Sequence, residues 1–199
     1  EIALNDSDLD GLNSHELAHQ WFGDLITCKT WEHIWLNEVW ATYSTSLWLE
    51  VRDGYQNGYL RNLRGAMRGL AARDQLSPDS DATRPAMVSP VYEHPWEVFR
   101  RTSNPYPKGA ATLHMLRSKL GEDLFFKGVR EYVQRYKNTS VETDDFRKVL
   151  EEVSGLSLEH FFTQWCERPG TPKVRIASTW DESSRTLLVT AEQLQRIDA

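Results

Sequence analysis

The spacing of apolar residues predicts a chain that is mainly α-helical. Residues 7–22 form the first predicted helix, with Ser7 and Asp10 resembling a capping box and Gly23 following its end. Residues 31–52 form the second, and apolar side chains cover nearly its whole circumference. A helix of that kind is buried, so we expect its tryptophans to form core rather than a substrate platform. They are Trp31, Trp35, Trp40 and Trp48.

Helical periodicity continues to residue 167, broken by one long connection. Residues 74–106 are rich in proline and are expected to be irregular. Pro107 suits the first turn of the helix that follows, since proline is favoured there. Thr143 and Ser157 are placed to cap two later helices, and Gly155 to end one of them. The predicted helices are 56–73, 107–120, 122–137, 143–153 and 157–167.

A change of period after "RPGTP" predicts a β-hairpin. Val174, Ile176 and Ser178 alternate with polar residues, "DESS" is a turn, and "TLLVTA" is a second strand. A lone hairpin is only marginally stable in water, so we expect it to open a further β domain. We therefore divide the chain into a partial catalytic domain, 1–170, and the truncated start of a β domain, 171–199. Both ends look like cuts through a longer protein.

Composition and charge narrow the class of protein. An apolar content of 40% and a charged content of 26% fit a folded globular chain. The net charge is −6 and the basic residues form no long run, so we expect no nucleic acid partner. No apolar run approaches the roughly 18 residues that span a bilayer, so we expect no membrane contact from this segment. Cys28 and Cys166 are expected to be free thiols, which leaves the compartment open, cytoplasmic or exported.

The stretch "HELAH", residues 15–19, has the spacing of a metal site. Residues four apart lie on one helical face, so His15 and His19 can direct two imidazoles at one point. Glu16 lies about 100° around the helix, beside that point, where it can serve as a general base without being a ligand. This is the arrangement that the HExxH pattern encodes.

Glu38 is the third candidate ligand. It follows His19 after 18 residues, in "IWLNEVW", inside the predicted buried helix. A carboxylate among such neighbours is costly unless it is paired or bound to a cation. Catalytic zinc prefers three protein ligands and one open position. We therefore predict one Zn2+ held by His15, His19 and Glu38, with a second electrophile stabilising the oxyanion of the substrate.

Several stretches of the chain resemble a known family. "HELAHQWFGDLIT" followed by "WLNE" resembles the alanyl aminopeptidase type of gluzincin zinc metallopeptidases, which includes the leukotriene-hydrolase branch. The resemblance continues through "RPAMVSPVYEHPWEVF", "YPKGAATLHMLR", "VETDDFRKVLEEVSG" and "FFTQWCERPGTP", and covers about residues 12–180. It implies a mainly α fold, the helical part of a thermolysin-like zincin catalytic domain, followed by the start of a β-sandwich domain.

The resemblance also implies roles for individual residues. Tyr106, in "PYPKG", matches the tyrosine whose hydroxyl stabilises the oxyanion. From the residues alone, Tyr106 only precedes a helix that starts at proline, where its hydroxyl can lie near a positive dipole end. Lys108 and Gly109 match the same motif, and we interpret both as structural, Lys108 as a solvated or packing charge and Gly109 as a site of close packing. The implied zinc ligands are His15, His19 and Glu38, and the implied general base is Glu16.

The chain departs from the family pattern in three places. Val39 stands where the family usually has glycine, and its bulk either narrows the cleft or changes nothing. Thr45 replaces a frequent carboxylate, so support for a ligand histidine is weaker or comes from elsewhere. The family's Gly-x-Met-Glu-Asn loop, whose glutamate binds the free amine of the substrate, belongs upstream, and only 14 residues precede His15.

Other polar residues are interpreted as structural. Four histidines lack a partner at ligand spacing and are expected on the surface or in hydrogen bonds: His33, His94, His114 and His160. For Asn37, orienting the backbone of Glu38 and contacting the substrate remain equal alternatives.

These observations favour a zinc-dependent aminopeptidase that acts on peptides with a free N-terminus. A zinc endopeptidase, or a zinc hydrolase of another substrate such as an epoxide, is the main alternative. A non-catalytic scaffold of the same fold is a third hypothesis, disfavoured because the ligands, the base and the tyrosine are all present.

Overall fold

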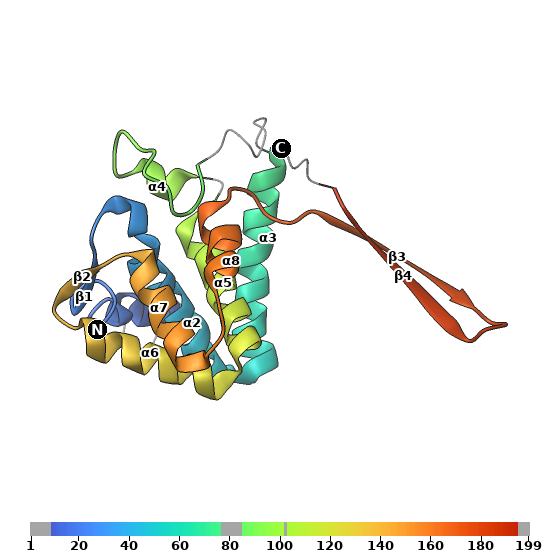
Figure 1. Cartoon of the computed structure of the whole chain (residues 1–199), viewed down its shortest axis with the longest axis horizontal. Coiled ribbons are helices and arrows are strands. Elements are labelled where there is room, and N and C mark those ends of the chain that lie inside the picture. Colours follow the sequence, from blue (N-terminus) through green and yellow to red (C-terminus); the bar gives the residue numbers. More distant parts are fainter. Residues whose placement is uncertain (1–8, 77–84, 102, 195–199) are drawn as a thin grey trace.

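The computed structural model describes residues 9–76, 85–101 and 103–194 of the 199-residue chain. Helices form the body of the molecule, and a two-stranded hairpin projects from it (Figure 1). The prediction of a mainly α fold is confirmed. The elements are α1 (Asp10–Ala18), β1 (Ile26–Cys28), η3 (Trp31–His33), α2 (Trp35–Gly54), η4 (Tyr55–Leu60), α3 (Arg61–Leu76), α4 (Glu97–Arg100), α5 (Pro105–Leu120), α6 (Glu122–Tyr136), β2 (Thr139–Val141), α7 (Thr143–Ser154), α8 (Glu159–Phe162), η6 (Thr163–Glu167), β3 (Val174–Asp181) and β4 (Thr186–Gln193).

The first helix is shorter than predicted. It ends at Ala18 rather than at residue 22. Beyond it, the backbone N–H groups of Asp24, Leu25 and Ile26 each bond the carbonyl five residues earlier, at 2.9, 3.2 and 3.0 Å. This wider, π-type winding leads the chain directly into β1, so the helix stops before Gly23 is reached. The predicted capping box involves Ser7, which lies outside the described residues.

Two helix starts differ from the prediction. α5 begins at Pro105, not Pro107, because the Asn104 side chain accepts from the N–H of Tyr106 at 3.0 Å. α7 is capped by Glu142 in a reciprocal capping box with Asp145, and Thr143 is already its first residue. A side-chain oxygen just before the helix satisfies N–H groups that the helix leaves free.

The remaining helix boundaries follow the sequence with smaller corrections. Gly155 ends α7 in the left-handed conformation (φ 71°), as predicted. Ser157 does not cap the next helix, because α8 starts at Glu159. The predicted helix 56–73 divides into the π-helical η4 and the longer α3. The connection 74–106, expected to be irregular, contains the short α4.

A small parallel sheet was not predicted. β1 pairs with β2 in the register Ile26↔Thr139 and Cys28↔Val141. The two strands are more than 100 residues apart in sequence, and each is only three residues long. Such a pairing depends on long-range packing, so local periodicity carries no signal for it.

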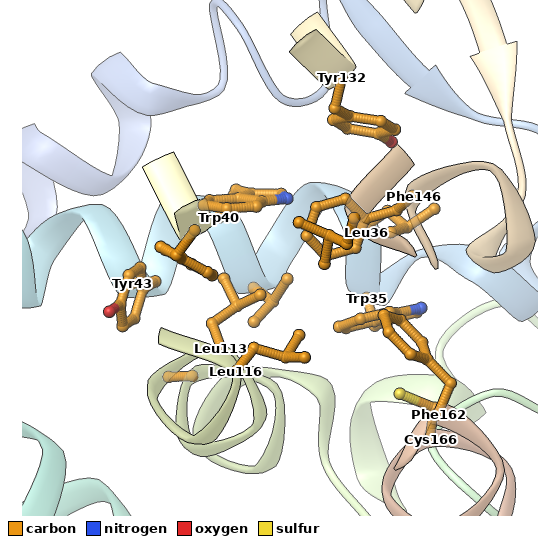
Figure 2. Close-up of a cluster of buried hydrophobic side chains, with 14 of the residues drawn as sticks. Trp35, Leu36, Trp40, Tyr43, Leu113, Leu116, Tyr132, Phe146, Phe162 and Cys166 are labelled. Atoms are coloured by element: carbon orange, nitrogen blue, oxygen red, sulfur yellow. The ribbon is translucent and has the colours of Figure 1, made fainter. Parts of the chain in front are cut away.

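The core lies around α2, where its aromatic side chains meet α5, α6 and α7. Figure 2 shows Trp35, Leu36 and Trp40 of α2 among these neighbours, with Leu113 and Leu116 of α5 beneath them. The Trp40 ring stacks on Phe22 at 4.7 Å between ring centroids. The core prediction is therefore confirmed for Trp35 and Trp40, which are both buried. It is wrong for Trp31 and Trp48, which are 43% and 44% exposed.

The predicted hairpin is present at the end of the described chain. β3 and β4 pair antiparallel over eight residues each, and every residue of both strands is exposed. Figure 1 shows the hairpin extending away from the helices. Within the described residues, no helix combines the length and the apolarity that crossing a membrane requires.

Candidate active site

The two histidines of the HExxH stretch point toward one place. His15 lies in the last turn of α1, and His19 is the residue that ends the helix. Their Nε2 atoms are 3.2 Å apart, and the ring centroids are 4.9 Å apart with the planes nearly perpendicular. The four-residue spacing therefore places the histidines on one face, as predicted.

Glu38 approaches the two histidines from α2. Its Oε2 atom lies 3.5 Å from Nε2 of His15 and 3.6 Å from Nε2 of His19. The side chain is 15% exposed, so the carboxylate lies at the edge of the core rather than in open solvent. In the part of the chain that the structure describes, this is the one group of three histidine, cysteine or acidic side chains with the geometry for a metal ion.

The separations of these three atoms fit a tetrahedral metal ion. Ligands at about 2.0–2.1 Å from a tetrahedral zinc lie roughly 3.3 Å from one another. The observed separations are 3.2, 3.5 and 3.6 Å. Two imidazole nitrogens and one carboxylate oxygen are also ligands that zinc accepts in catalytic sites. The donor set and its spacing therefore suit zinc.

The ring of His19 is held by the backbone of its own turn. Its Nδ1 atom lies 3.0 Å from the carbonyl oxygen of Phe22, which can only accept a hydrogen bond. The proton is thus on Nδ1, and the Nε2 lone pair faces Glu38 and His15. The π-type winding after Ala18 places this carbonyl. Sequence reasoning did not find it, because a backbone oxygen leaves no trace in residue types.

Thr45 supports α1 rather than a ligand ring. Its hydroxyl donates to the carbonyl of Gly11 at 3.0 Å and accepts from the hydroxyl of Ser14 at 3.3 Å. The two alternatives for this position were weaker support of a ligand histidine and support by another group. The second holds for His19, because its Nδ1–H donates to the Phe22 carbonyl.

Glu16 lies beside the three converging side chains, on an exposed part of α1. Together with His15 it lines a cleft of about 750 Å³ that continues along α2 past Thr42 and Thr45 to α3. A carboxylate in that position faces solvent and the cleft, and it is free to exchange a proton with a water there.

Tyr106 lies across the site from Glu16, in the first turn of α5. Its ring centroid is 6.1 Å from that of His15. Burial, followed by the charge of Glu38, a hydrogen bond to Glu38 and the charge of Glu16, raises the pKa of Tyr106 to about 12. The phenol is therefore protonated at neutral pH and can donate a hydrogen bond. Tyr106 lies within α5, not before it, and the carboxylates outweigh any effect of the helix dipole on its pKa.

Val39 points away from the cleft. It is fully buried, and a Cβ added to Gly109 of α5 would lie only 2.6 Å from its Cγ2. The bulk of Val39 therefore lies between α2 and α5, and Gly109 is there for close packing, as predicted. Lys108 is buried and donates to the carbonyl of Arg168 at 2.9 Å, which confirms its interpretation as a packing residue.

Asn37 and Cys28 join β1 to the start of α2. The backbone N–H of Cys28 donates to Oδ1 of Asn37 at 3.1 Å, so this side chain bonds the backbone of β1 and not that of Glu38. Burial raises the pKa of the Cys28 thiol to about 11. Both cysteines are free thiols, as predicted.

The other histidines have the structural partners that were expected. Nδ1 of His33 lies 3.0 Å from the hydroxyl of Thr143, and Nδ1 of His114 lies 2.8 Å from that of Tyr59. Nδ1 of His94 accepts from the N–H of Trp96 at 3.3 Å. His160 is exposed.

Comparison with known proteins identifies the family. Residues 5–165 match the peptidase family M1 domain. The chain belongs to peptidase family M1. Among curated relatives of this M1 chain, aminopeptidase M1-C of Oryza sativa subsp. japonica is 34% identical over 163 residues, which are 82% of this chain and 18% of that protein. Aminopeptidase N of Escherichia coli (strain K12) is 28% identical over 186 residues, 94% of this chain and 20% of that protein. The chain thus spans about a fifth of the length of the curated relatives it matches.

Solved structures of other M1 proteins share the fold. Native yeast LTA4 hydrolase is 29% identical, with a TM-score of 0.67 over 84% of this chain and 27% of that one. The M1 zinc metallopeptidase from Deinococcus radiodurans is also 29% identical, with a TM-score of 0.62 over 82% of this chain and 34% of that one. A mutant of the latter is described with a Tyr-Ser-Ala substrate bound. Membership of M1 implies zinc as the metal of this M1 chain.

Proposed function

We propose that this M1 chain carries the catalytic centre of a zinc aminopeptidase, which hydrolyses the first peptide bond of substrates with a free N-terminus. One observation carries the proposal. The Nε2 atoms of His15 and His19 and Oε2 of Glu38 form a triangle of zinc size. Glu16 and Tyr106 stand on its open side.

The metal site of the proposal is a single zinc ion held by His15, His19 and Glu38. Zinc, when bound, supplies a Lewis acid that polarises a carbonyl and makes a water more acidic. The Nδ1–H of His19 donates to Phe22, so this ring keeps its free lone pair directed at the ion. Two imidazoles, one carboxylate and an open position are also the ligand set of catalytic zinc sites.

The remaining side chains perform the proton chemistry. Glu16 takes a proton from the attacking water and then passes it to the nitrogen of the leaving amine. Tyr106 is protonated at neutral pH, since its pKa is raised to about 12, and its hydroxyl donates to the oxyanion that forms at the scissile carbonyl. Glu16 thus handles the proton and Tyr106 the developing charge.

We further propose that the chain divides near residue 170, with 1–170 catalytic and 171–199 beginning a β domain. The hairpin supports this division. One of its faces carries Val174, Ile176 and Trp180 opposite Ala191 and Leu187, and this face is exposed. An exposed apolar sheet face of this kind requires a covering partner, which further strands of a β domain provide.

The proposal is tested on the protein as its gene encodes it. Zinc content and the hydrolysis of aminoacyl anilides, with free and with blocked amines, are measured for wild type and Glu16→Gln. We expect about one bound zinc per site and a loss of about 10²–10⁴-fold in kcat for the variant, the range that general bases contribute. Glu159→Gln, at an exposed glutamate of α8, is the matched control and is expected to leave kcat unchanged.

The outcomes separate the competing functions. Equal rates on free and blocked substrates would exclude an aminopeptidase in favour of an endopeptidase. Hydrolysis of an epoxide without hydrolysis of any anilide would favour the alternative chemistry, for which the likeness to yeast LTA4 hydrolase is the supporting observation. Zinc binding with no hydrolysis of either substrate would point to the scaffold.

A further inference from the structure

Phe99 of α4 lies directly against the catalytic tyrosine. The rings of Phe99 and Tyr106 stack, with centroids 5.7 Å apart and planes inclined by 29°. The Tyr106 ring also lies 6.1 Å from the ring of His15, between centroids. The phenol ring therefore contacts both an aromatic partner and a proposed metal ligand. Offset stacking of this kind fixes the plane of a ring as well as burying it.

Asn104 joins the two aromatic residues through their backbones. Its Oδ1 accepts from the N–H of Tyr106 at 3.0 Å, and its Nδ2 donates to the carbonyl of Phe99 at 2.6 Å. The side chain is 4% exposed, so both bonds are shielded from water. One amide thus fixes the start of α5 and the end of α4 together, and it determines how the two rings face each other.

The segment that presents Phe99 is itself anchored. Arg101 is buried and donates from Nη1 to the carbonyl of Ala86 at 3.0 Å and from Nη2 to that of Val91 at 2.5 Å. These bonds tie the end of α4 to the preceding connection. On its other edge, the ring of Phe99 meets those of Trp31 at 6.3 Å and Trp96 at 6.1 Å. The position of the ring is therefore set by contacts on several sides.

We infer that Phe99 is a positioning residue for Tyr106, and that Asn104 holds the two as one unit. Phe99 acts through the tyrosine and not on the substrate. By restricting rotation of the phenol ring, it keeps the hydroxyl aimed at the oxyanion before the substrate arrives. Preorganised donors of this kind stabilise a transition state because they do not reorient during the reaction. The inference rests on the proposed function, since Phe99 can position Tyr106 for catalysis only if the Tyr106 hydroxyl stabilises the oxyanion.

A double-mutant cycle on the full protein tests this assignment. Phe99→Leu is expected to lower kcat roughly tenfold and to leave KM and zinc content unchanged. The loss is moderate because the Tyr106 hydroxyl is still present and is only less well oriented. Phe99→Tyr keeps the stack and is expected to restore kcat to within about twofold of wild type. In a Tyr106→Phe background, Phe99→Leu is expected to lower kcat no further.

The control variant is Phe161→Leu. Phe161 is a partly buried phenylalanine of α8 that packs against the core away from the site, so its loss affects stability alone. We expect its effect on kcat to be the same in both backgrounds. Equal losses for Phe99→Leu with and without the Tyr106 hydroxyl would overturn the inference. A rise in KM with kcat unchanged would also overturn it, because it would show contact with the substrate.

A second measurement does not depend on activity. In protein with ¹³C-labelled tyrosine, the ring signals of Tyr106, assigned from Tyr106→Phe, are expected to shift in Phe99→Leu, whereas those of Tyr132 do not. Failure of the proposed function appears as no hydrolysis by wild type, with this shift still present. Unmoved Tyr106 signals would overturn the positioning role whatever the activity.

Discussion

α2 meets α1 through polar side chains at the candidate site, and one residue further along it packs on α5 through an apolar side chain. Toward α1 it presents Glu38, which approaches two histidines, and Thr45, which bonds Ser14 and Gly11. Toward α5 it presents the next residue, Val39, packed on Gly109 without space for a methyl group. Two consecutive side chains of one helix therefore serve different purposes. One helps to form the metal site, and the other fixes the distance between the helices that carry it.

The difference teaches how the molecule separates function from stability. The α1 side holds groups that are costly to bring together without a cation, since a carboxylate and two imidazoles replace apolar contacts. The contact of Val39 with Gly109 is close packing, which stabilises the fold but takes no part in the proposed chemistry. Substitutions on the two sides are therefore expected to change different measured quantities, and the following predictions are arranged by the size of that change.

The largest effect is expected from Glu38→Gln. The amide keeps the shape of the side chain but loses its charge, so zinc affinity is expected to fall by more than about 100-fold, beyond the 10–100-fold that outer-shell changes cost. The free energy of unfolding of the zinc-free protein is expected to stay within about 0.5 kcal/mol of wild type. Competition with a chelator measures the first quantity and urea denaturation the second.

Glu32→Gln serves as the control for that experiment, because Glu32 is a nearby acid of η3 outside the ligand triangle. If Glu38→Gln bound zinc as tightly as this control does, the ligand assignment would be wrong.

Gly109→Ala is expected to have the opposite profile. A Cβ would lie 2.6 Å from Cγ2 and 2.8 Å from Cβ of Val39, so the helices must move apart. Overpacking of this kind costs about 1–3 kcal/mol of unfolding free energy. Adding Val39→Ala is expected to recover most of the loss, since it removes the atoms that clash. Chemical denaturation of the single and double variants measures both the loss of unfolding free energy and its recovery.

Gly65→Ala is the matched control for the glycine experiment. Gly65 lies within α3, and a Cβ there would meet nothing within 4 Å. Its replacement is expected to be neutral or to stabilise by up to about 1 kcal/mol, because alanine favours helix. Equal behaviour of Gly65→Ala and Gly109→Ala would contradict the close packing of α2 on α5.

The smallest expected effect is a dependence of the unfolding free energy on pH that arises from His114 of α5. Nδ1 of His114 in α5 lies 2.8 Å from the Tyr59 hydroxyl, which in turn is hydrogen-bonded to the hydroxyl of Tyr43 in α2. Burial, followed by the charge of Arg117, lowers the pKa of His114 in the folded protein. The unfolded chain then binds more protons just below pH 6.5, the ordinary pKa of histidine. The contribution of neutral His114 to stability is therefore present above pH 6.5 and is lost as the pH falls through the lowered pKa.

Unfolding free energies measured from pH 7.5 to 5 check this expectation. His114→Gln is expected to remove the part of the slope that His114 contributes. His160→Gln, at an exposed histidine of α8, is the control and is expected to leave the slope unchanged. A slope that persists unchanged in His114→Gln would place its origin elsewhere, for example at the metal site.

Local patterns predicted most of the helices and the hairpin, because periodicity and turn residues act over a few neighbours. These patterns failed where contacts with residues distant in the sequence decide the secondary structure or the burial of a side chain. Trp31 and Trp48 have the residue type of a core, but their side chains reach solvent. Thr143 looked like a cap, but Glu142 and Asp145 satisfy each other's backbone N–H groups first. α4 and the parallel pair β1–β2 are too short to show a period of their own.

The sequence by itself determined which residues this M1 chain offers as metal ligands. The spacing of His15 and His19, and the placement of Glu38 in an apolar helix, predict the three candidate ligands, because helical geometry and the cost of burying a charge depend on neighbouring residues. Only the tertiary structure decided what surrounds that site. The Phe22 carbonyl behind His19, the Phe99 ring on Tyr106 and the fit of Val39 against Gly109 each join segments whose contact depends on how the helices pack. No residue type encodes such contacts, since they are properties of the assembled core.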